Sequence, residues 1–185
     1  YIDSCKKIEY MFPKGHATAY VIMTVRIGYF KLYKPSAFYA AVFSVKTEDF
    51  DYTTMCTGYL NAKKACVPHD ENLSATEKSR MSLLEIVMEM YARGIDFAPL
   101  DLYKSDAYRF LPVEGSERLI LPPLSAVPGL GLSAAKKIVD ERAIQPFFTI
   151  EQFKDRTKVN KTVLALLRSH NMLDGLPEDD QITLL

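Results

Sequence analysis

The 185-residue chain contains no tryptophan, three cysteines and three histidines. Cys5, Cys56 and Cys66 are odd in number and lack the CxxC spacing, and the three histidines lie far apart in the chain. This sparse pattern predicts neither a disulfide framework nor a zinc site. We therefore expect no metal-binding residues and no cofactor in the chain.

Long hydrophobic runs are also missing. No stretch of about 18 uninterrupted apolar residues occurs, so we expect no membrane span and no membrane partner. The polar start, YIDSCKKIEY, lacks the apolar segment of a signal peptide, which favours a cytoplasmic location. Tyr1 stands where an initiator methionine is expected, so we interpret the sequence as a piece of a longer protein.

The net charge is zero, but the charges are segregated along the chain. Residues 1–35 carry six basic and two acidic residues, and residues 136–170 carry eight basic and four acidic ones. Residues 70–117 compensate with ten acidic and five basic residues. Such blocks suit two surfaces that face a polyanion, although they are also compatible with ordinary solvated helix faces.

The first half of the chain has a helical pattern. The apolar spacing over residues 16–33 predicts a buried helix, and Pro35 ends it. Ser36 is then expected to cap a second helix, and Thr47 a short segment that ends at Gly58.

A capping box, Ser74 to Glu77, opens a further helix, which Gly94 ends. The residues expected to form its apolar stripe are Leu83, Leu84, Val87, Met88 and Tyr91.

The second half changes in character at residue 95. Residues 95–121 alternate in places and are interrupted by prolines and a glycine, which predicts short strands and a turn. Residues 122–173 have the pattern of a compact helical unit, in which Thr149 caps one helix, and residues 174–185 form an acidic tail. The predicted fold is mainly α with a small β element, divided into residues 1–94, 95–121, 122–173 and 174–185.

The stretch Pro128-Gly129-Leu130-Gly131 precedes a helix that carries Ser133, Lys136 and Lys137. A helix N-terminus offers free N–H groups and the positive end of the helix dipole, and glycines leave room for an anion. With Leu130 as an inward anchor, the stretch predicts a helix-hairpin-helix that binds a nucleic-acid phosphate without reading the bases. An ordinary glycine turn between core helices is the alternative.

A second, degenerate hairpin is predicted at residues 157–163, which lack glycine. Its candidate contacts with the neighbouring phosphate are Asn160, Lys161 and Thr162. Together with the first hairpin it gives a tandem helix-hairpin-helix domain at 122–173 that is expected to bind double-stranded DNA through its backbone.

Further motifs resemble those of a known family. The stretch YMFPKGHATAYVIMTVRIGYFKLYKPSAFYAA resembles the fingers segment of bacterial C-family replicative DNA polymerases. Four other stretches resemble the PolC subtype of DNA polymerase III: EDFD, LDLYKSDA, PPLSAVPGLG and DGLPEDDQITLL. The resemblance implies the C-terminal part of such a polymerase, with residues 1–94 in the fingers, 95–121 as a connector and 122–173 binding primer–template duplex.

The resemblance also implies roles for single residues. Lys14, His16 and Arg26 are expected to contact the phosphates of an incoming deoxynucleoside triphosphate, and Phe12 and Tyr20 to pack beside the base. Each of these side chains could instead serve only the core or a local hydrogen bond.

The end of the chain, QITLL, resembles the peptide with which PolC-type enzymes bind the bacterial sliding clamp. The resemblance implies that Gln181 supplies hydrogen bonds and that Leu184 and Leu185 fill an apolar groove. Because leucine replaces a terminal phenylalanine in this motif, we expect a weakened contact.

No Asp-x-Asp pair flanked by strands is evident. Asp49 and Asp51 have the spacing, but they follow a helix and are interpreted as a cap and a solvated position. The catalytic carboxylates and the Mg²⁺ ions that polymerases need are thus expected in the palm of the parent chain, and this segment alone is expected to be inactive. The palm and thumb would be its partners within that chain.

Two other classes of function remain open. The chain could be a free-standing helix-hairpin-helix DNA-binding or repair module, with the first 120 residues as scaffold. It could also be a structural interaction domain, which would show no salt-dependent affinity for DNA.

Overall fold

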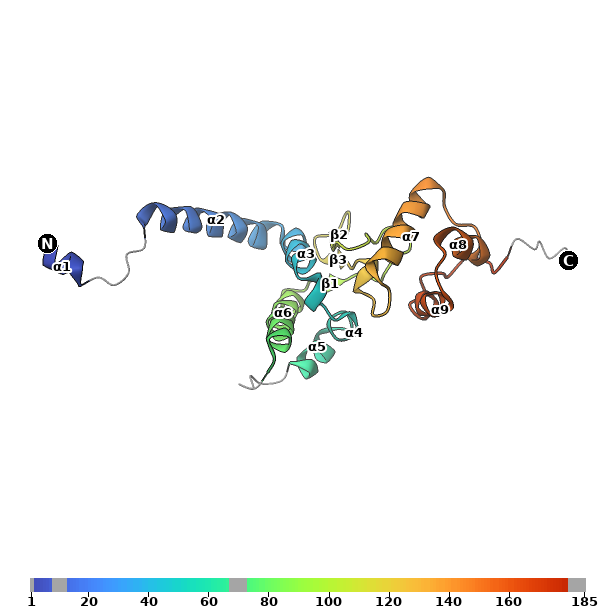
Figure 1. The fold of residues 1–185 in the computed structure, drawn as a ribbon, viewed down its shortest axis with the longest axis horizontal. Helices are drawn as coiled ribbons and strands as arrows, with labels where there is room; N and C mark the ends of the chain where they lie inside the picture. Colours follow the sequence, from blue (N-terminus) through green and yellow to red (C-terminus); the bar gives the residue numbers. More distant parts are fainter. Residues whose placement is uncertain (1, 8–12, 67–72, 180–185) are drawn as a thin grey trace.

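A computed structural model describes residues 2–7, 13–66 and 73–179 of the chain. Helices dominate the described residues, and a small three-stranded sheet lies between two groups of helices (Figure 1). The mainly helical fold with a small β element is therefore confirmed. None of the described helices is long and apolar enough to cross a membrane.

The N-terminal elements extend away from the rest of the molecule. A short helix, α1 (Ile2–Lys6), precedes the 20-residue helix α2 (Lys14–Tyr33), which projects from the rest of the molecule and is attached near its C-terminal end, where Lys31 lies 2.7 Å from Glu89 (Figure 1). The prediction of a buried helix is wrong here, because α2 contains no buried residue. Its apolar side chains include Val25, 66% exposed, and Leu32, 69% exposed. Helices that are apolar on all sides are normally covered by other protein.

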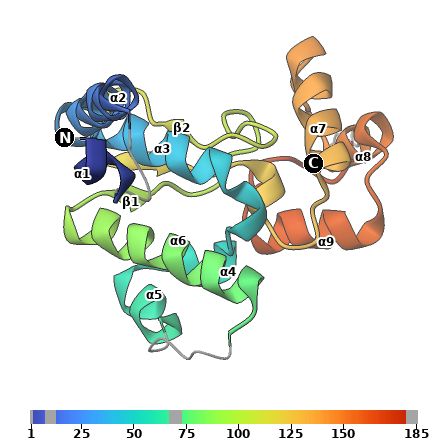
Figure 2. The same ribbon diagram turned by 60° about the vertical axis from the view of Figure 1, so that its left-hand side comes forward.

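Four helical segments follow α2 and surround a hydrophobic core, called the first core below. They are α3 (Pro35–Val45), the 3₁₀ turn η1 (Thr47–Asp49), α4 (Tyr52–Met55) and α5 (Tyr59–Ala65). The 18-residue helix α6 (Ala75–Ala92) packs across them (Figure 2).

The caps of these helices differ in part from those predicted. Pro35 is the first residue of α3, so Ser36 lies inside the helix and is buried rather than being its cap. Thr47 belongs to the 3₁₀ turn and donates to main-chain oxygens of α3, whereas Asp51 caps α4. The capping box of Ser74 and Glu77 is present as predicted, with the Ser74 N–H donating to Glu77 Oε2 at 2.8 Å.

The sheet closes the first core. Strand β1 (Asp96–Phe97) pairs in parallel with β3 (Leu119–Leu121), and β2 (Leu111–Pro112) pairs antiparallel with the other edge of β3. Four aromatic rings meet between the sheet and α3, with centroids 4.7 to 6.1 Å apart; they are Phe43, Phe50, Phe97 and Phe110. Such contacts add to the burial of apolar area and fix the sheet against α3.

The second core is formed mainly by the C-terminal helices. The 3₁₀ turn η2 (Leu124–Ala126), α7 (Leu132–Ile144), α8 (Ile150–Thr157) and α9 (Lys161–Ser169) surround it (Figure 2). Thr149 caps α8 as predicted, by accepting from the Gln152 N–H. Three residues of the segment between β1 and β2 also belong to this core; they are Leu100, Leu102 and Ala107. The two cores touch at Tyr52, whose ring lies 5.3 Å from that of His170.

Candidate nucleic-acid interface

The first hairpin lies where the sequence predicts it, between η2 and α7. Its anchor Leu130 is only 2% exposed, and the Leu130 N–H donates to the Val127 carbonyl at 3.0 Å. Gly129 and Gly131 on either side are exposed. The Leu130 side chain therefore secures the loop, while the glycine backbone faces solvent.

The two glycines serve different purposes. Gly129 has φ +90°, a conformation that L-residues avoid, and a Cβ there would lie 3.7 Å from Leu166 of α9. Gly131 is the N-cap of α7 and has an ordinary extended backbone, φ −63° and ψ 151°. A backbone conformation that favours glycine is thus present at Gly129 and not at Gly131. At Gly131 the absence of a side chain leaves the start of α7 uncovered.

The second hairpin repeats this conformation without glycine. Lys158 ends α8 in the left-handed region with φ 55°, as Gly129 does in the first hairpin. Val159, 8% exposed, is the inward anchor, and Asn160 is the N-cap of α9. Both hairpins thus have the same order of features: a residue with positive φ, then a buried anchor, then the N-cap of the next helix.

The two helix starts differ in one respect. The Asn160 Oδ1 accepts from the Val163 N–H at 2.8 Å, so α9 is capped by its own chain. No side chain caps α7 at Gly131. The amides of Leu132 and Ser133 at the start of α7 are consequently the more open anion site of the two.

The predicted cations Lys136, Lys137 and Lys161, and also Lys158, which was not among the predicted contacts, lie on the segments next to the two helix starts. Lys136 and Lys137 lie one turn into α7, and Lys158 and Lys161 flank the start of α9; all four are exposed. Among the described residues, no carboxylate lies within 4.0 Å of these four ammonium groups. Their charges are available for a phosphate.

Other basic residues of this block are already engaged. Arg156 pairs with Glu141 at 3.3 Å and lies over the Phe147 ring. Arg168 pairs with Glu178 through two contacts of 2.7 and 2.8 Å. These pairs stabilise the domain internally, and the exposed lysines of the block that lack a carboxylate partner among the described residues are Lys154 on α8 and the four lysines around the hairpins.

The predicted nucleotide-contacting residues are only partly assembled. His16 and Tyr20 lie together on α2, with ring centroids 4.4 Å apart in an edge-to-face arrangement. Lys14 lies about 160° around the helix axis from His16, so the two residues are on nearly opposite sides of α2. Arg26 lies about 15 Å from His16 along the helix axis. Phe12 lies outside the described residues.

The predicted clamp-binding residues, Gln181, Leu184 and Leu185, also lie outside the described residues. The segment before them is attached to the second core. The Ile150 N–H donates to the Pro177 carbonyl at 2.9 Å, and the Glu151 N–H donates to the Glu178 carbonyl at 3.1 Å. The start of α8 thus holds this segment in place.

Asp49 and Asp51 have local structural roles. Asp49 accepts from the Ser79 hydroxyl at 2.5 Å, and Asp51 lies 3.9 Å from Arg80. Partial burial acts to raise the pKa of Asp51, but hydrogen bonds from Thr53 and Thr54 outweigh it and hold this pKa below its usual value.

Two comparisons agree with this geometry. Residues 94–182 match the family model described as helix-hairpin-helix motif. The whole chain is also similar to proteins named DNA polymerase III PolC-type: 46% identical to that of Caldanaerobacter subterraneus subsp. tengcongensis, 45% to that of Listeria innocua and 43% to that of Bacillus subtilis.

These matches cover 100% of the chain but only 13% of each relative. They include the residues before 94, which the hairpin model does not reach. The chain therefore belongs to the PolC-type DNA polymerase III family and represents a segment of such a polymerase that contains a helix-hairpin-helix motif.

Proposed function

We propose that this segment holds the primer–template duplex by its phosphates during template-directed DNA synthesis by a PolC-type polymerase. The main support is the repeated hairpin, in which two helix starts lie among lysines that have no carboxylate within 4.0 Å in the described part of the chain. Because α7 and α9 pack in one core, the two starts form a fixed pair. Two phosphate contacts at a fixed spacing hold the DNA backbone better than a single contact does. Neither contact requires a hydrogen bond to a base.

The chemistry of each contact is that of charge-assisted hydrogen bonds. A phosphate at the start of α7 would accept from the Leu132 and Ser133 amides, with the Lys136 and Lys137 ammonium groups nearby. Bonds of this kind contribute roughly 1.5–3 kcal/mol each, since one partner is charged. The helix dipole adds to them in the same direction.

Single lysine-to-glutamine variants test this proposal in the 185-residue chain. We expect Lys136→Gln, Lys137→Gln or Lys161→Gln each to weaken duplex binding and to reduce the slope of log affinity against log salt by about 1. Lys64→Gln on α5 is the matched control and should change neither. Equal slopes for all four variants would exclude a phosphate contact by the hairpin lysines.

We further propose that α2 contributes to the incoming deoxynucleoside triphosphate site of the polymerase. The adjacent rings of His16 and Tyr20 supply an aromatic edge and a hydrogen-bonding nitrogen, and Lys14, Arg26 and Phe12 are the further candidates. The exposure of α2 supports this role, because the rest of the polymerase, including palm and thumb, would cover its apolar sides.

His16→Ala in the full-length polymerase tests the nucleotide site. It should raise KM for the nucleotide while leaving the affinity for primer–template unchanged. Thr18→Ala, two residues further along α2 and exposed, is the control. A KM that both variants leave unaltered would exclude His16.

The segment after Asp179 is proposed to bind the sliding clamp through Gln181, Leu184 and Leu185. Support comes from the resemblance of QITLL to clamp-binding peptides and from the attachment of residues 177 and 178 to α8. Leu185→Phe should tighten binding to the clamp, because it restores an aromatic anchor. Deletion of residues 181–185 that leaves clamp affinity intact would refute this contact.

Catalysis itself is assigned to the remainder of the polymerase. The palm carboxylates and their Mg²⁺ ions would lie outside this segment, so the 185-residue chain alone should not extend a primer. The proposed location is the bacterial cytoplasm, where the chromosome is replicated.

A further inference from the structure

The segment between β1 and β2, residues 98–110, forms a rigid loop. Asp106 accepts from the N–H groups of Tyr108 and Arg109 at 2.9 and 3.0 Å, and its carboxylate pairs with the Arg109 side chain at 3.2 Å. Ser105 is fully buried and accepts from the Asp101 N–H at 3.1 Å. Side chains therefore satisfy the backbone within the loop, as in short Asx turns.

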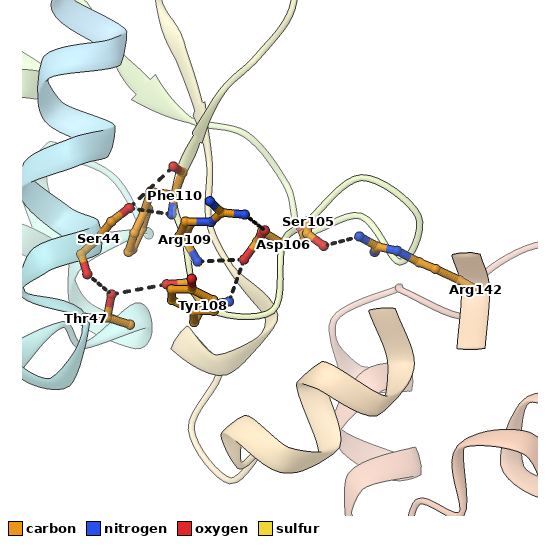
Figure 3. A network of polar contacts seen from close by, with 8 residues as sticks. All are labelled: Ser44, Thr47, Ser105, Asp106, Tyr108, Arg109, Phe110 and Arg142. Carbon is orange, nitrogen blue, oxygen red and sulfur yellow. Dashed lines mark hydrogen bonds and ion pairs between the residues drawn. The ribbon is translucent and has the colours of Figure 1, made fainter. Parts of the chain in front are cut away.

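One end of this loop is attached to α3 and η1. The Phe110 N–H donates to the Ser44 hydroxyl at 2.9 Å, and the Thr47 hydroxyl lies 3.3 Å from the Tyr108 carbonyl (Figure 3). Phe110 itself is buried in the first core. This end of the loop is thus attached to α3, which follows α2 after the single non-helical residue Lys34.

The other end is attached to α7 by Arg142. Its guanidinium donates to the carbonyl of Leu102. It also donates to the carbonyl of Ser105 at 2.6 Å, a contact drawn in Figure 3. Burial lowers the pKa of Arg142, an effect that the Asp101 and Asp106 charges oppose. Among the described residues, no carboxylate lies within 4.0 Å of it, so its charge serves only these carbonyls.

An arginine suits this position because its planar fork reaches two carbonyl oxygens at once. Without it, both oxygens would lose a donor in a partly buried site. The contact joins the helix that carries the first hairpin to a loop that is fastened to the α2–α3 side of the molecule.

We propose that Arg142 is a positioning residue that sets the angle of α7, and hence of the phosphate held at its start, relative to α2 and α3. Arg142 lies ten residues beyond Leu132, about 15 Å along the helix. A tilt of about 5° over this length displaces the start of α7 by about 1.3 Å. Displacements near 1 Å can slow a reaction by on the order of 100-fold.

The inference rests on the proposed function, in which α7 holds the duplex and α2 faces the nucleotide. It predicts that loss of Arg142 affects the alignment of bound DNA more than the affinity for DNA. The phosphate contacts belong to the other end of α7 and to α9, and they do not involve Arg142.

The experiment compares Arg142→Met, Arg142→Lys and Arg118→Met in the full-length polymerase. Arg118 is an exposed arginine whose side chain makes no hydrogen bond or ion pair with the described residues, so its replacement is the control. The measured quantities are the dissociation constant for primer–template and the single-turnover rate of incorporation at saturating DNA and nucleotide. Circular dichroism monitors the fold.

Arg142→Met should slow incorporation on the order of 10–100-fold while the dissociation constant changes less than about threefold. Arg142→Lys, which keeps the charge and can reach one carbonyl, should recover part of the rate. An unchanged rate in Arg142→Met would overturn the proposal, as would an affinity loss as large as the rate loss. If the methionine variant does not fold, an unchanged rate in Arg142→Lys overturns it.

This outcome is separable from a failure of the proposed function. If α7 does not hold the duplex, Gly131→Asp leaves duplex affinity unchanged in the otherwise wild-type polymerase. If only the role of Arg142 is wrong, Gly131→Asp still weakens binding, and Arg142→Met incorporates at the wild-type rate.

Discussion

Replacing Gly131 by aspartate separates phosphate binding from folding. Gly131 has the extended backbone of an ordinary N-cap, and no atom of the described residues lies within 4 Å of a Cβ built there. Aspartate is among the preferred N-cap residues, and its negative charge interacts favourably with the positive end of the helix dipole. The stability of the chain should therefore stay the same or rise by a few tenths of a kcal/mol to about 1 kcal/mol.

The same carboxylate would occupy the place proposed for the phosphate. Two negative charges about 4 Å apart repel by roughly 2–4 kcal/mol at an effective dielectric constant of about 40 to 20. This predicts a loss of duplex affinity of about 30- to 1,000-fold at low salt. Gly131→Asn is the matched control, because asparagine caps α7 equally well without a charge. Its side chain would occupy one of the amides at the start of α7, so duplex affinity should fall only about tenfold.

Fluorescence anisotropy with a labelled primer–template duplex measures both variants, and thermal unfolding checks their stability. Equal affinities for wild type, Gly131→Asp and Gly131→Asn would refute a phosphate site at α7. So would an affinity loss in Gly131→Asp that only accompanies unfolding.

Three further predictions concern other parts of the chain. Asn160→Asp keeps the cap of α9 but adds a charge, so duplex affinity should fall about tenfold, measured by anisotropy; no change would mean that the second hairpin holds no phosphate. Partial burial acts to raise the pKa of Asp106, but hydrogen bonds from Tyr108 and Arg109 outweigh it and lower this pKa. The contribution of Asp106 to stability is therefore present above its pKa in the unfolded chain, near 4, and disappears as the pH falls through its pKa in the folded chain. The stability difference between wild type and Asp106→Asn, from urea unfolding, should thus be larger at pH 7 than at pH 3, and equal differences would contradict this. Burial, together with the Asp96 and Asp51 charges, raises the pKa of the Cys56 thiol, so iodoacetamide should alkylate it at pH 8 much more slowly than after unfolding in urea, as peptide mass spectrometry would show.

Local signals predicted much of this fold correctly. The Ser74–Glu77 capping box and the Thr149 cap are decided by side chains within three residues of the backbone group that they bind, so they can be recognised from sequence. The anchor Leu130 and the positive φ at Gly129 follow in the same way from the glycine pattern.

Interactions distant in sequence were harder to foresee. The spacing in α2 correctly predicted a helix, but burial depends on neighbours, and the chain spans only 13% of the length of its relative from Caldanaerobacter subterraneus. The second hairpin repeats the first through a left-handed Lys158, which carries no glycine signal. The sequence shows Arg142 only as one of the positive charges of residues 136–170. Its contacts cannot be predicted from local patterns, because its carbonyl partners lie 37 and 40 residues away in the chain.

Amide chemical shifts of the 185-residue chain, recorded while a DNA duplex is added, test the central claim most directly. A phosphate grip predicts that the largest changes fall on Leu132 and Ser133 at the start of α7 and on Lys161 and Thr162 at the start of α9. The same amides should respond to duplexes of unrelated sequence, because no base is read. Changes centred on α5 and α6 instead, with both helix starts unaffected, would contradict the account.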